Sequence, residues 1–382
     1  MPLATGIATQ LTTPVLAPEA IEVRYRVQVH AFGSGFSVGD LVADIDNPKN
    51  VGYADYMNGV PEIFFTLNQD DAQAVTLAAY INKAHVRVLR NDRVVATGWL
   101  MDTDENDRDV VFYAYGYLAG LFWTLSDWNQ EFLSKEIGTI VRSLWVAAQA
   151  QTNDGLSFIA TGTIESPATA GAGGARLTLP LYTVFYKRLL FIFQEFAALA
   201  QSDTGNTTIF EITPTELPEF NLWANRGVDL PDVKWEWGGQ VNGFHRVRAG
   251  VNHRNDLFAV GAAPHDTLLR KNTSDATDIS TYFRRQEAIF LSWVRDETEL
   301  ERVNKRRLAV AMRDDIALSL RLKPNSVVPP GGLSSQFRIG DAPRVVIDRG
   351  ATQIDAYMRL TGYQVTFEGG TEQVYPQLQS KS

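Results

Sequence analysis

Apolar and polar residues alternate near the start of the chain. Every second position of residues 21–32 is apolar, and the positions between are mostly polar or charged. The apolar positions are Ile21, Val23, Tyr25, Val27 and Val29. Since side chains of a strand point alternately to its two faces, this pattern predicts a half-buried strand. Two more strands are expected over residues 41–45 and 62–67, after a glycine-containing turn at 33–39.

A helical pattern follows these strands. Asn68 is a residue type that caps helices, so it predicts a helix over residues 71–82. The side chains expected on its buried face are Ala72, Val75, Leu77 and Ala79.

Residues 85–115 carry the clearest local pattern. The segments 85–90 and 93–101 are strand-like and meet at Asn91-Asp92, a pair that tolerates tight turns. A polar turn over 102–109 leads into a third strand over 110–115. Three consecutive antiparallel strands form a meander, which suggests a barrel or a sandwich. A short aromatic helix or turn is expected over 117–125.

The middle of the chain mixes helix and strand. Residues 137–150 show an apolar face of helical spacing, made by Ile137, Ile140, Val141, Leu144 and Ala148. The small-residue segment 166–175 predicts a loop. The remaining expectations are a helix over 181–201 that Gly205 ends, a strand over 207–213, a strand pair over 244–251 and 256–261, and helix over 282–312.

Strand patterns return at the end of the chain, over 316–322, 344–348, 354–364 and 373–378. The fold class expected is therefore α+β and β-rich, with β-rich ends that bracket a mixed α/β middle. Internal repeats at short solenoid periods are absent from the sequence.

Composition narrows the class of protein. The chain has 382 residues, 45% of them hydrophobic, with a formal net charge of −9 and no cysteine. This content argues against global disorder. The absence of cysteine excludes disulfides, thiolate zinc sites, iron–sulfur ligation and cysteine nucleophiles. An acidic chain is also a poor general coat for nucleic acid, which is bound through clustered Lys and Arg.

Targeting and membrane segments are not expected. The first 20 residues contain no Lys or Arg and no uninterrupted apolar stretch, unlike a secretory signal. The most apolar window, 177–200, is interrupted by Pro180, Lys187, Arg188, Gln194 and Glu195. We expect this window to be a buried helix of a protein made in a cytoplasm, without stable membrane association.

Two groups of residues could bind a metal ion. His245, His253 and His265, with Asp256 and Asp266, lack the close ligand spacing of a zinc site. The acidic run Asp102, Asp104, Glu105, Asp107 and Asp109 lacks the frame of a calcium-binding loop between helices. We expect ordinary imidazoles for the first group and a solvated hairpin turn for the second.

One segment could act on or bind a sugar. Trp223, Trp235 and Trp237 lie near Asp229, Asp232 and Glu236, and aromatic platforms beside acids occur at sugar sites. The same residue types also occur in domain interfaces, where Trp buries a large area. The sequence leaves both readings open.

The remaining motifs are weak. Gly171-Ala172-Gly173-Gly174 has no lysine–serine pair after it, so it indicates a flexible loop rather than a phosphate site. Lys305-Arg306-Arg307 follows several acids and is expected on a solvated helix face. No catalytic residue, cofactor-binding residue or metal ligand is therefore assigned.

Three segments carry a family resemblance. Residues 86–121, with three strands and a turn of aromatic and small residues, resemble a pattern of phage tail hub proteins. Residues 189–214 resemble the helix, glycine turn and strand of the domain inserted in such hubs. Residues 337–378, with Gly340-Asp341 before a Val-rich strand, resemble the closing β domain. The chain thus resembles the minor tail, baseplate-hub-like proteins of long-tailed phages and the N-terminal hub region of tail-associated lysins.

This resemblance implies an architecture. Two β-barrel-like hub domains would bracket a mixed α/β insertion: an N-terminal arm at 1–20, a first hub domain at 21–130, a middle region at 131–315 and a closing β domain at 316–382. It also implies a homotrimer whose six β domains form a ring at the distal end of the tail, in the virion.

The function implied is structural and not enzymatic. Such a hub joins the tail tube or distal tail proteins to a central fibre or spike protein and takes part in genome delivery. DNA and the tape measure protein would pass through its lumen without specific binding. The chain ends at Ser382 with no peptidase or muramidase segment, so we expect an adaptor. The alternatives are a host-surface carbohydrate-binding tail protein and a cell-wall hydrolase.

Overall fold

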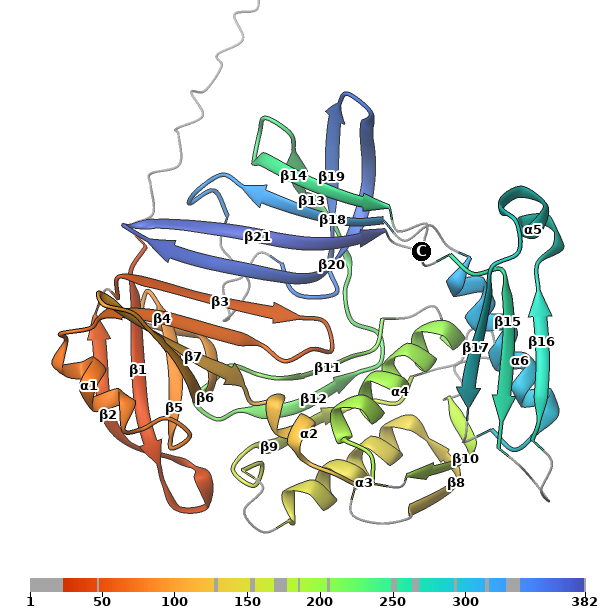
Figure 1. Cartoon of the computed structure of the whole chain (residues 1–382), viewed down its shortest axis with the longest axis horizontal. Helices are drawn as coiled ribbons and strands as arrows, with labels where there is room; N and C mark the ends of the chain where they lie inside the picture. Colours follow the sequence, from red (N-terminus) through yellow and green to blue (C-terminus); the bar gives the residue numbers. More distant parts are fainter. Residues whose placement is uncertain are drawn as a thin grey trace, which may run out of the picture.

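The structure is a computed structural model that is rich in β-strands (Figure 1). The residues that it describes are 23–46, 48–126, 130–151, 155–167, 177–184, 186–204, 207–248, 253–262, 268–291, 294–312, 316–327 and 337–380. Among these residues, no helix combines the length and the hydrophobicity that crossing a membrane requires.

A 13-stranded sheet dominates the fold. Its first strands are β1 (Tyr25–Phe32), β2 (Val38–Asp46), β3 (Asn50–Tyr56), β4 (Glu62–Asn68), β5 (Ala84–Arg90), β6 (Arg93–Glu105) and β7 (Asp109–Gly116). Its later strands are β13 (Asp229–Glu236), β14 (Val241–Arg248), β18 (Ile316–Leu322), β19 (Ala342–Arg349), β20 (Thr352–Glu368) and β21 (Thr371–Ser380). The main path runs β14-β18-β21-β20-β3-β4-β7-β6-β5-β1-β2, and β13 joins through β19.

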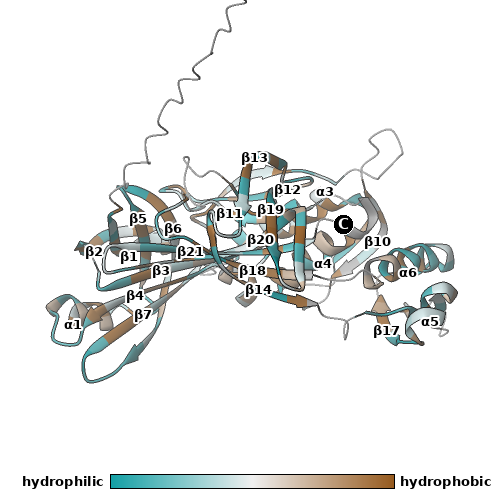
Figure 2. Ribbon diagram, turned by 90° about the horizontal axis from the view of Figure 1, so that it is seen from above, coloured by the Kyte–Doolittle hydropathy of each residue, from teal (hydrophilic) through white to brown (hydrophobic). Residues whose placement is uncertain are grey.

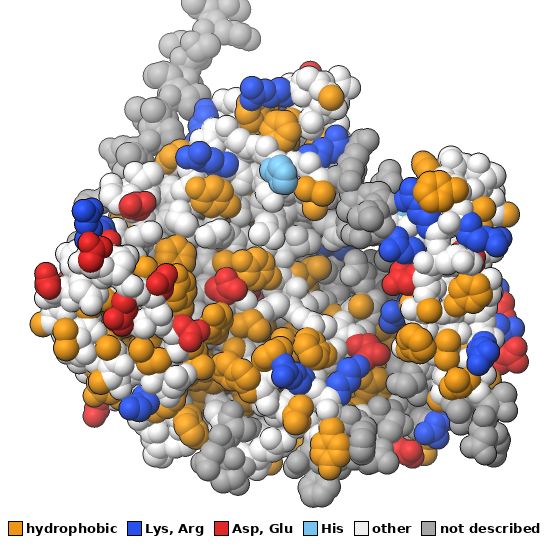
Figure 3. All heavy atoms as spheres, viewed as in Figure 1, with side chains coloured by type: hydrophobic (Ala, Val, Ile, Leu, Met, Phe, Trp, Pro, Cys, Tyr) orange, Lys and Arg blue, Asp and Glu red, His pale blue; other side chains and the backbone are white. Residues whose placement is uncertain are grey.

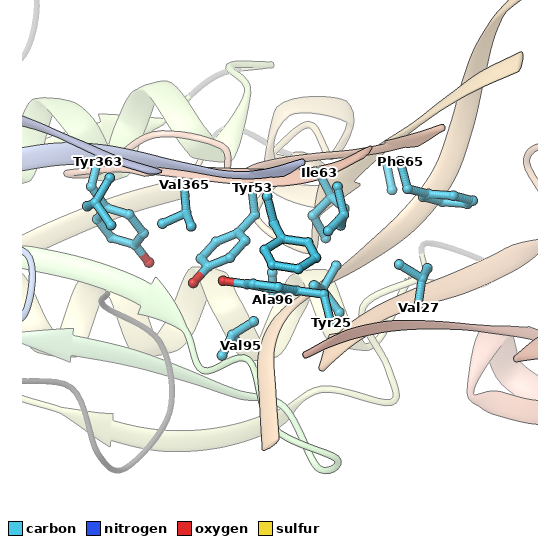
Figure 4. Packing of buried hydrophobic residues seen from close by; sticks show 14 of the residues in the cluster. Tyr25, Val27, Tyr53, Ile63, Phe65, Val95, Ala96, Tyr363 and Val365 are labelled. Atoms are coloured by element: carbon cyan, nitrogen blue, oxygen red, sulfur yellow. The ribbon is translucent and has the colours of Figure 1, made fainter. Parts of the chain in front are cut away.

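The two ends of the chain meet in the middle of this sheet. β20 pairs with β3 in antiparallel register from Gly362↔Tyr56 to Glu368↔Asn50. Backbone hydrogen bonds therefore join the first and last parts of the chain directly, and the buried side chains of both parts belong to one hydrophobic core. In Figure 4, Tyr25 and Tyr53 lie beneath β3 and β20 with their hydroxyl groups close together, and Tyr25 packs on Phe367 at 4.8 Å between ring centroids.

A second core lies under the helices of the middle region. It contains α2 (Ala119–Trp123), α3 (Ile137–Gln149), α4 (Leu189–Thr204) and two small sheets. The sheets comprise β8 (Gln130–Glu136) with β10 (Thr178–Val184), and β9 (Ala160–Ile164), β11 (Ile209–Ile212) and β12 (Glu219–Trp223). Trp145 stacks on Phe220 at 4.3 Å between ring centroids, which fixes α3 on β12.

A small α/β unit lies at one end of the molecule, beyond α4 and β10 (Figure 2). It comprises β15 (Asp256–Gly261), β16 (Arg270–Ser274) and β17 (Gln286–Leu291), with α5 (Ala276–Tyr282) and α6 (Glu297–Ala311). Leu300 and Val303 of α6 are buried in the second core, so this unit shares its apolar interior with the middle region. The remaining helices are η1 (Ser34–Phe36) and α1 (Ala72–Ala78).

Much of the expected pattern is confirmed. The strands of the 85–115 meander, the last four strands and the apolar face of α3 all occur where the sequence predicts them. Asn91 and Asp92 form the hairpin turn with φ of 48° and 61°. The β-rich α+β organisation is confirmed. No closed barrel forms among the described residues, since the sheet is open at β2 and β14, so the barrel-like part of the expectation is not confirmed.

Several local predictions are wrong. α1 is capped by Asp71, whose side chain accepts from the Gln73 N–H, instead of Asn68, and it buries Ala74 and Leu77 while Val75 is exposed. The expected helix over 181–201 is strand β10 followed by α4, and that over 282–312 contains β17. β14 and β15 do not pair, because β14 joins the large sheet and β15 the small unit. In each case contacts distant in sequence override a local pattern.

Candidate assembly surfaces

A buried ion pair ties the two ends of the chain together beneath the β3–β20 junction. Glu372 of β21 is fully buried and accepts hydrogen bonds from Arg90 Nε at 2.6 Å and Arg90 Nη2 at 3.0 Å. It also accepts one from the Tyr25 hydroxyl at 2.6 Å. Burial raises the pKa of Tyr25 well above its usual range, and Tyr53 and Glu372 add to this effect. Both side chains of the ion pair are satisfied within the described residues, which fits a structural role.

A second titratable group lies at the same junction. Burial, and then the nearby carboxylate of Glu211, raise the pKa of Asp55 to about 7. An acid whose pKa is raised by folding holds its proton more tightly in the folded state, so it destabilises the fold as pH rises between its unfolded pKa near 4 and about 7.

We expect Asp55→Asn to remove this penalty. The free energy of unfolding of the variant minus that of the wild type should be larger at pH 8 than at pH 4.5. The change in this difference should occur between the two pH values. Urea unfolding at both pH values measures it. Asp70→Asn, at an exposed carboxylate, is the matched control. A constant difference between Asp55→Asn and the wild type would contradict the prediction.

The face of the sheet opposite the core is largely uncharged. Tyr53, Phe65 and Val365 point into the core, so their neighbours along each strand point outward. Most of these outward side chains are small, amide, hydroxyl or aromatic, and the exposed carboxylates Glu62 and Glu368 lie at the strand ends. The uncharged members are Gly52, Ala54, Phe64, Gln364, Thr366, Gln373 and Tyr375.

The hairpin that joins β6 to β7 is acidic. Asp102, Asp104 and Glu105 are exposed on the second half of β6, which pairs only with β7 among the described residues. Asp107 is exposed in the turn, where Asn106 Oδ1 accepts from two backbone N–H groups. We call Asp102, Asp104, Glu105 and Asp107 the acidic hairpin. None of these four forms an ion pair within the part of the chain that the structure describes, and the prediction of a hairpin turn is confirmed.

The end of the sheet at β14 is basic. β14 is the last strand of the main path, and its residues 243–248 pair only with β18 among the described residues. Around this strand lie His245, Arg246, Arg321 and Lys323, which we call the basic edge. Among the described residues, no carboxylate pairs with them, and Arg246 Nε is buried without a hydrogen-bond partner. Figure 3 shows Lys and Arg side chains over β14, β18 and β19–β20 at the top, and Asp and Glu over α1 and the ends of β4 and β7 at the left.

The histidines considered as metal ligands are dispersed. His253 Nε2 lies 2.6 Å from Asp278 Oδ2 in the small α/β unit, His245 lies on the large sheet, and His265 is outside the described residues, as is Asp266. Within the described ranges, no group of three His, Asp or Glu side chains could hold a metal ion, and that includes the acidic hairpin.

The three tryptophans do not form an exposed platform. Trp235 is 1% exposed and packs on Phe337. Trp223 Nε1 donates to Glu211 Oε1 at 3.0 Å, and Trp237 packs against Phe244 and under Arg349. Their apolar area is used inside the fold, which fits the packing alternative.

The other candidate motifs have ordinary positions or are outside the described residues. Lys305 forms an i,i+4 ion pair with Glu301 at 2.7 Å on α6, as a solvated helix face predicts. The segment Gly171-Ala172-Gly173-Gly174 lies outside the described residues.

Comparison with solved structures gives the fold. The tail protein of Neisseria meningitidis MC58 is similar over 93% of this chain and 96% of its own, with a TM-score of 0.62 and 13% identity. The 43 kDa tail protein of prophage MuSo2 from Shewanella oneidensis is similar over 93% and 98%, with a TM-score of 0.59 and 9% identity. The chain has the fold of phage tail proteins. The prophage tail protein gp18 of Listeria monocytogenes shares this tail-protein fold over 93% and 94%, with a TM-score of 0.54 and 9% identity.

A chain of a protein complex is also similar in fold. A chain of the Francisella PdpA-VgrG complex is similar over 94% of this chain and 53% of its own, with a TM-score of 0.51 and 9% identity. By sequence, no family model matches, and no curated protein matches. The resemblance to tail proteins that the three segments predicted is therefore confirmed at the level of the fold.

Sequence reasoning missed the basic edge. Its residues come from two segments about 75 positions apart, and only the pairing of β14 with β18 brings them together. The acidic hairpin was visible as a run of carboxylates, but its place on the same sheet, with six strands between β6 and β14, was not.

Proposed function

We propose that this chain is a non-enzymatic structural subunit of a phage tail hub. The observation that carries the proposal is the match to tail proteins over more than nine-tenths of both chains, so the likeness includes the inserted helices as well as the sheet. A subunit of this kind works through assembly.

The proposed hub is a homotrimer. The strands of residues 21–130 and of the closing segment 316–382 would act as two hub domains, joined at β3–β20, with the segment 131–315 as the insertion. Three copies would place six such domains around a ring. Closed cyclic symmetry supports this arrangement, because it covers strand edges that otherwise promote aggregation.

The proposed location is the distal end of the tail in the virion. There the ring would join the tail tube or distal tail proteins to a central fibre or spike protein. Around the β3–β20 junction, the outer face suits a lumen through which DNA and the tape measure protein pass during ejection, because small, amide and hydroxyl side chains predominate there and few cations could hold phosphates.

Light scattering of the purified chain across a concentration range tests the trimer. We expect a species of three times 42.4 kDa at high concentration. Since assembly could require a template, the same measurement is made after mixing with purified tail tubes stripped of their tips. A chain that stays monomeric and fails to bind the tubes would contradict the proposal.

A further inference from the structure

We infer that the basic edge of one copy of this chain docks on the acidic hairpin of the next copy. This inference rests on the proposed trimer and names the surfaces that would form it. It gives a partner to each of two surfaces of opposite charge that lie on widely separated strands of one sheet.

The first support is charge complementarity. Asp104, Glu105 and Asp107 are exposed and have no ion-pair partner in the described part of the chain, and the same is true of Arg321 and Lys323. The Lys323 amine donates only to the Gly238 carbonyl at 2.8 Å, and Arg321 reaches only Gln373 at 3.5 Å. Clustered like charges without partners repel each other, and a neighbour of opposite charge removes that cost while it steers docking.

The second support is the free backbone at both places. The second half of β6 pairs on one side with β7, and residues 243–248 of β14 pair on one side with β18, within the described ranges. An exposed strand edge is a ready template for pairing with another chain.

The third support is the direction of the strands. Seven pairings separate β14 from β6 along the sheet, and all seven are antiparallel. β14 and β6 therefore run in opposite directions. Rotation about a ring axis preserves strand direction along that axis, so β14 of one copy would meet β6 of the next in antiparallel pairing and continue the sheet.

The geometry also selects the type of assembly. Six strands lie between β14 and β6 in one sheet, so the two surfaces do not meet within one chain. Contacts between different surfaces of identical copies are heterologous, and they close into a ring when the rotation permits. Further copies of this chain can therefore supply a partner for both the basic edge and the acidic hairpin.

Charge reversal tests the inference. Asp104→Lys/Glu105→Lys and Arg321→Glu/Lys323→Glu change exposed residues only, so each variant should fold with an unchanged melting temperature. Each should raise the dissociation constant of the trimer about a hundredfold or more, because like charges then face each other. High salt should weaken the wild-type trimer in the same direction.

Combining the two pairs of charge-reversal substitutions, in one chain or in a mixture of chains, tests the pairing of the two surfaces directly. One chain that carries all four substitutions has both surfaces reversed, so it should form trimers again. A mixture of the two double variants should not close a ring, because an odd number of copies leaves one mismatched contact. Glu216→Lys/Glu219→Lys reverses two exposed charges at the turn before β12 and is the matched control.

The outcomes separate the two proposals. A wild-type trimer that both double variants leave intact would overturn the docking surfaces and leave the trimeric hub standing. Loss of the trimer in the double variants without recovery in the fourfold variant would also overturn the pairing of these two surfaces. A wild-type chain that never forms trimers, alone or with tail tubes, would contradict the hub itself.

Discussion

Replacement of Arg90 by methionine is expected to lower the free energy of unfolding by about 3–5 kcal/mol, since it leaves a buried carboxylate without its counter-ion. Glu372 is fully buried, and Arg90 supplies two of the hydrogen bonds that it accepts. The Tyr25 hydroxyl alone cannot neutralise the remaining charge. Because Arg90 belongs to β5 and Glu372 to β21, the effect would weaken the packing between the first and last parts of the chain.

Urea unfolding of Arg90→Met measures this effect. Arg87→Met is the matched control, since Arg87 lies on the same strand and makes only a 3.4 Å contact to the Glu216 carbonyl. The double variant Arg90→Met/Glu372→Gln should recover part of the loss, because no buried charge remains. An equal loss in Arg87→Met and Arg90→Met would show that the ion pair has no special role.

Replacement of Gly227 by alanine is expected to cost at least about 4 kcal/mol or to prevent folding, because the change combines backbone strain with overlap. Gly227 has a φ of +101°, which L side chains rarely adopt. A Cβ atom there would overlap the carbonyl oxygen of Gly340, which itself has a φ of +96°. Neither backbone segment can yield easily, because Ala342 N donates to Val228 O and Gly340 N to Leu360 O, both at 2.9 Å.

The matched control is Gly238→Ala. Gly238 has a φ of +81°, but a Cβ atom there would meet nothing within 4 Å. The control thus carries only the cost of a positive φ, about 1–2 kcal/mol. Thermal and urea unfolding of both variants isolate the contribution of the close approach. Similar losses in the two variants would mean that the backbones around Gly340 move apart without cost.

Both predictions concern contacts between residues that are distant in sequence. The close approach of the Gly227 and Gly340 backbones also explains why Gly340 is followed by Asp341. Asp341 Oδ1 accepts from Val228 N at 3.1 Å, and Oδ2 accepts from Arg338 N at 2.8 Å. The aspartate thus holds the segment before β13 against the turn before β19. In the sequence this pair only indicated a β domain; its partner 113 residues earlier was not visible.

Local patterns were sufficient for elements that local physics governs. The hairpin at Asn91-Asp92 follows from residues that tolerate positive φ, and the buried face of α3 from apolar spacing of 3.6 residues. The last four strands follow from short-range alternation and from proline and glycine at their ends. Resemblance of ordered segments was enough to predict the tail-protein fold, although no single motif was specific.

Only the tertiary structure decided which strands become neighbours. The sequence predicted that β14 pairs with the segment of β15, but β14 pairs with β18, about 70 residues later in the chain. Leu318 and Leu320 of β18 belong to the core of the large sheet, and burial there favours this pairing. Likewise β10 forms within the apolar window for which the sequence predicted a helix, since β8 offers it a strand edge. Apolar runs fit a buried helix and a buried strand equally well, and burial against a partner distant in sequence chooses between them. The acidic hairpin and the basic edge come to lie on one sheet for the same reason: sheet order is a property of the whole chain.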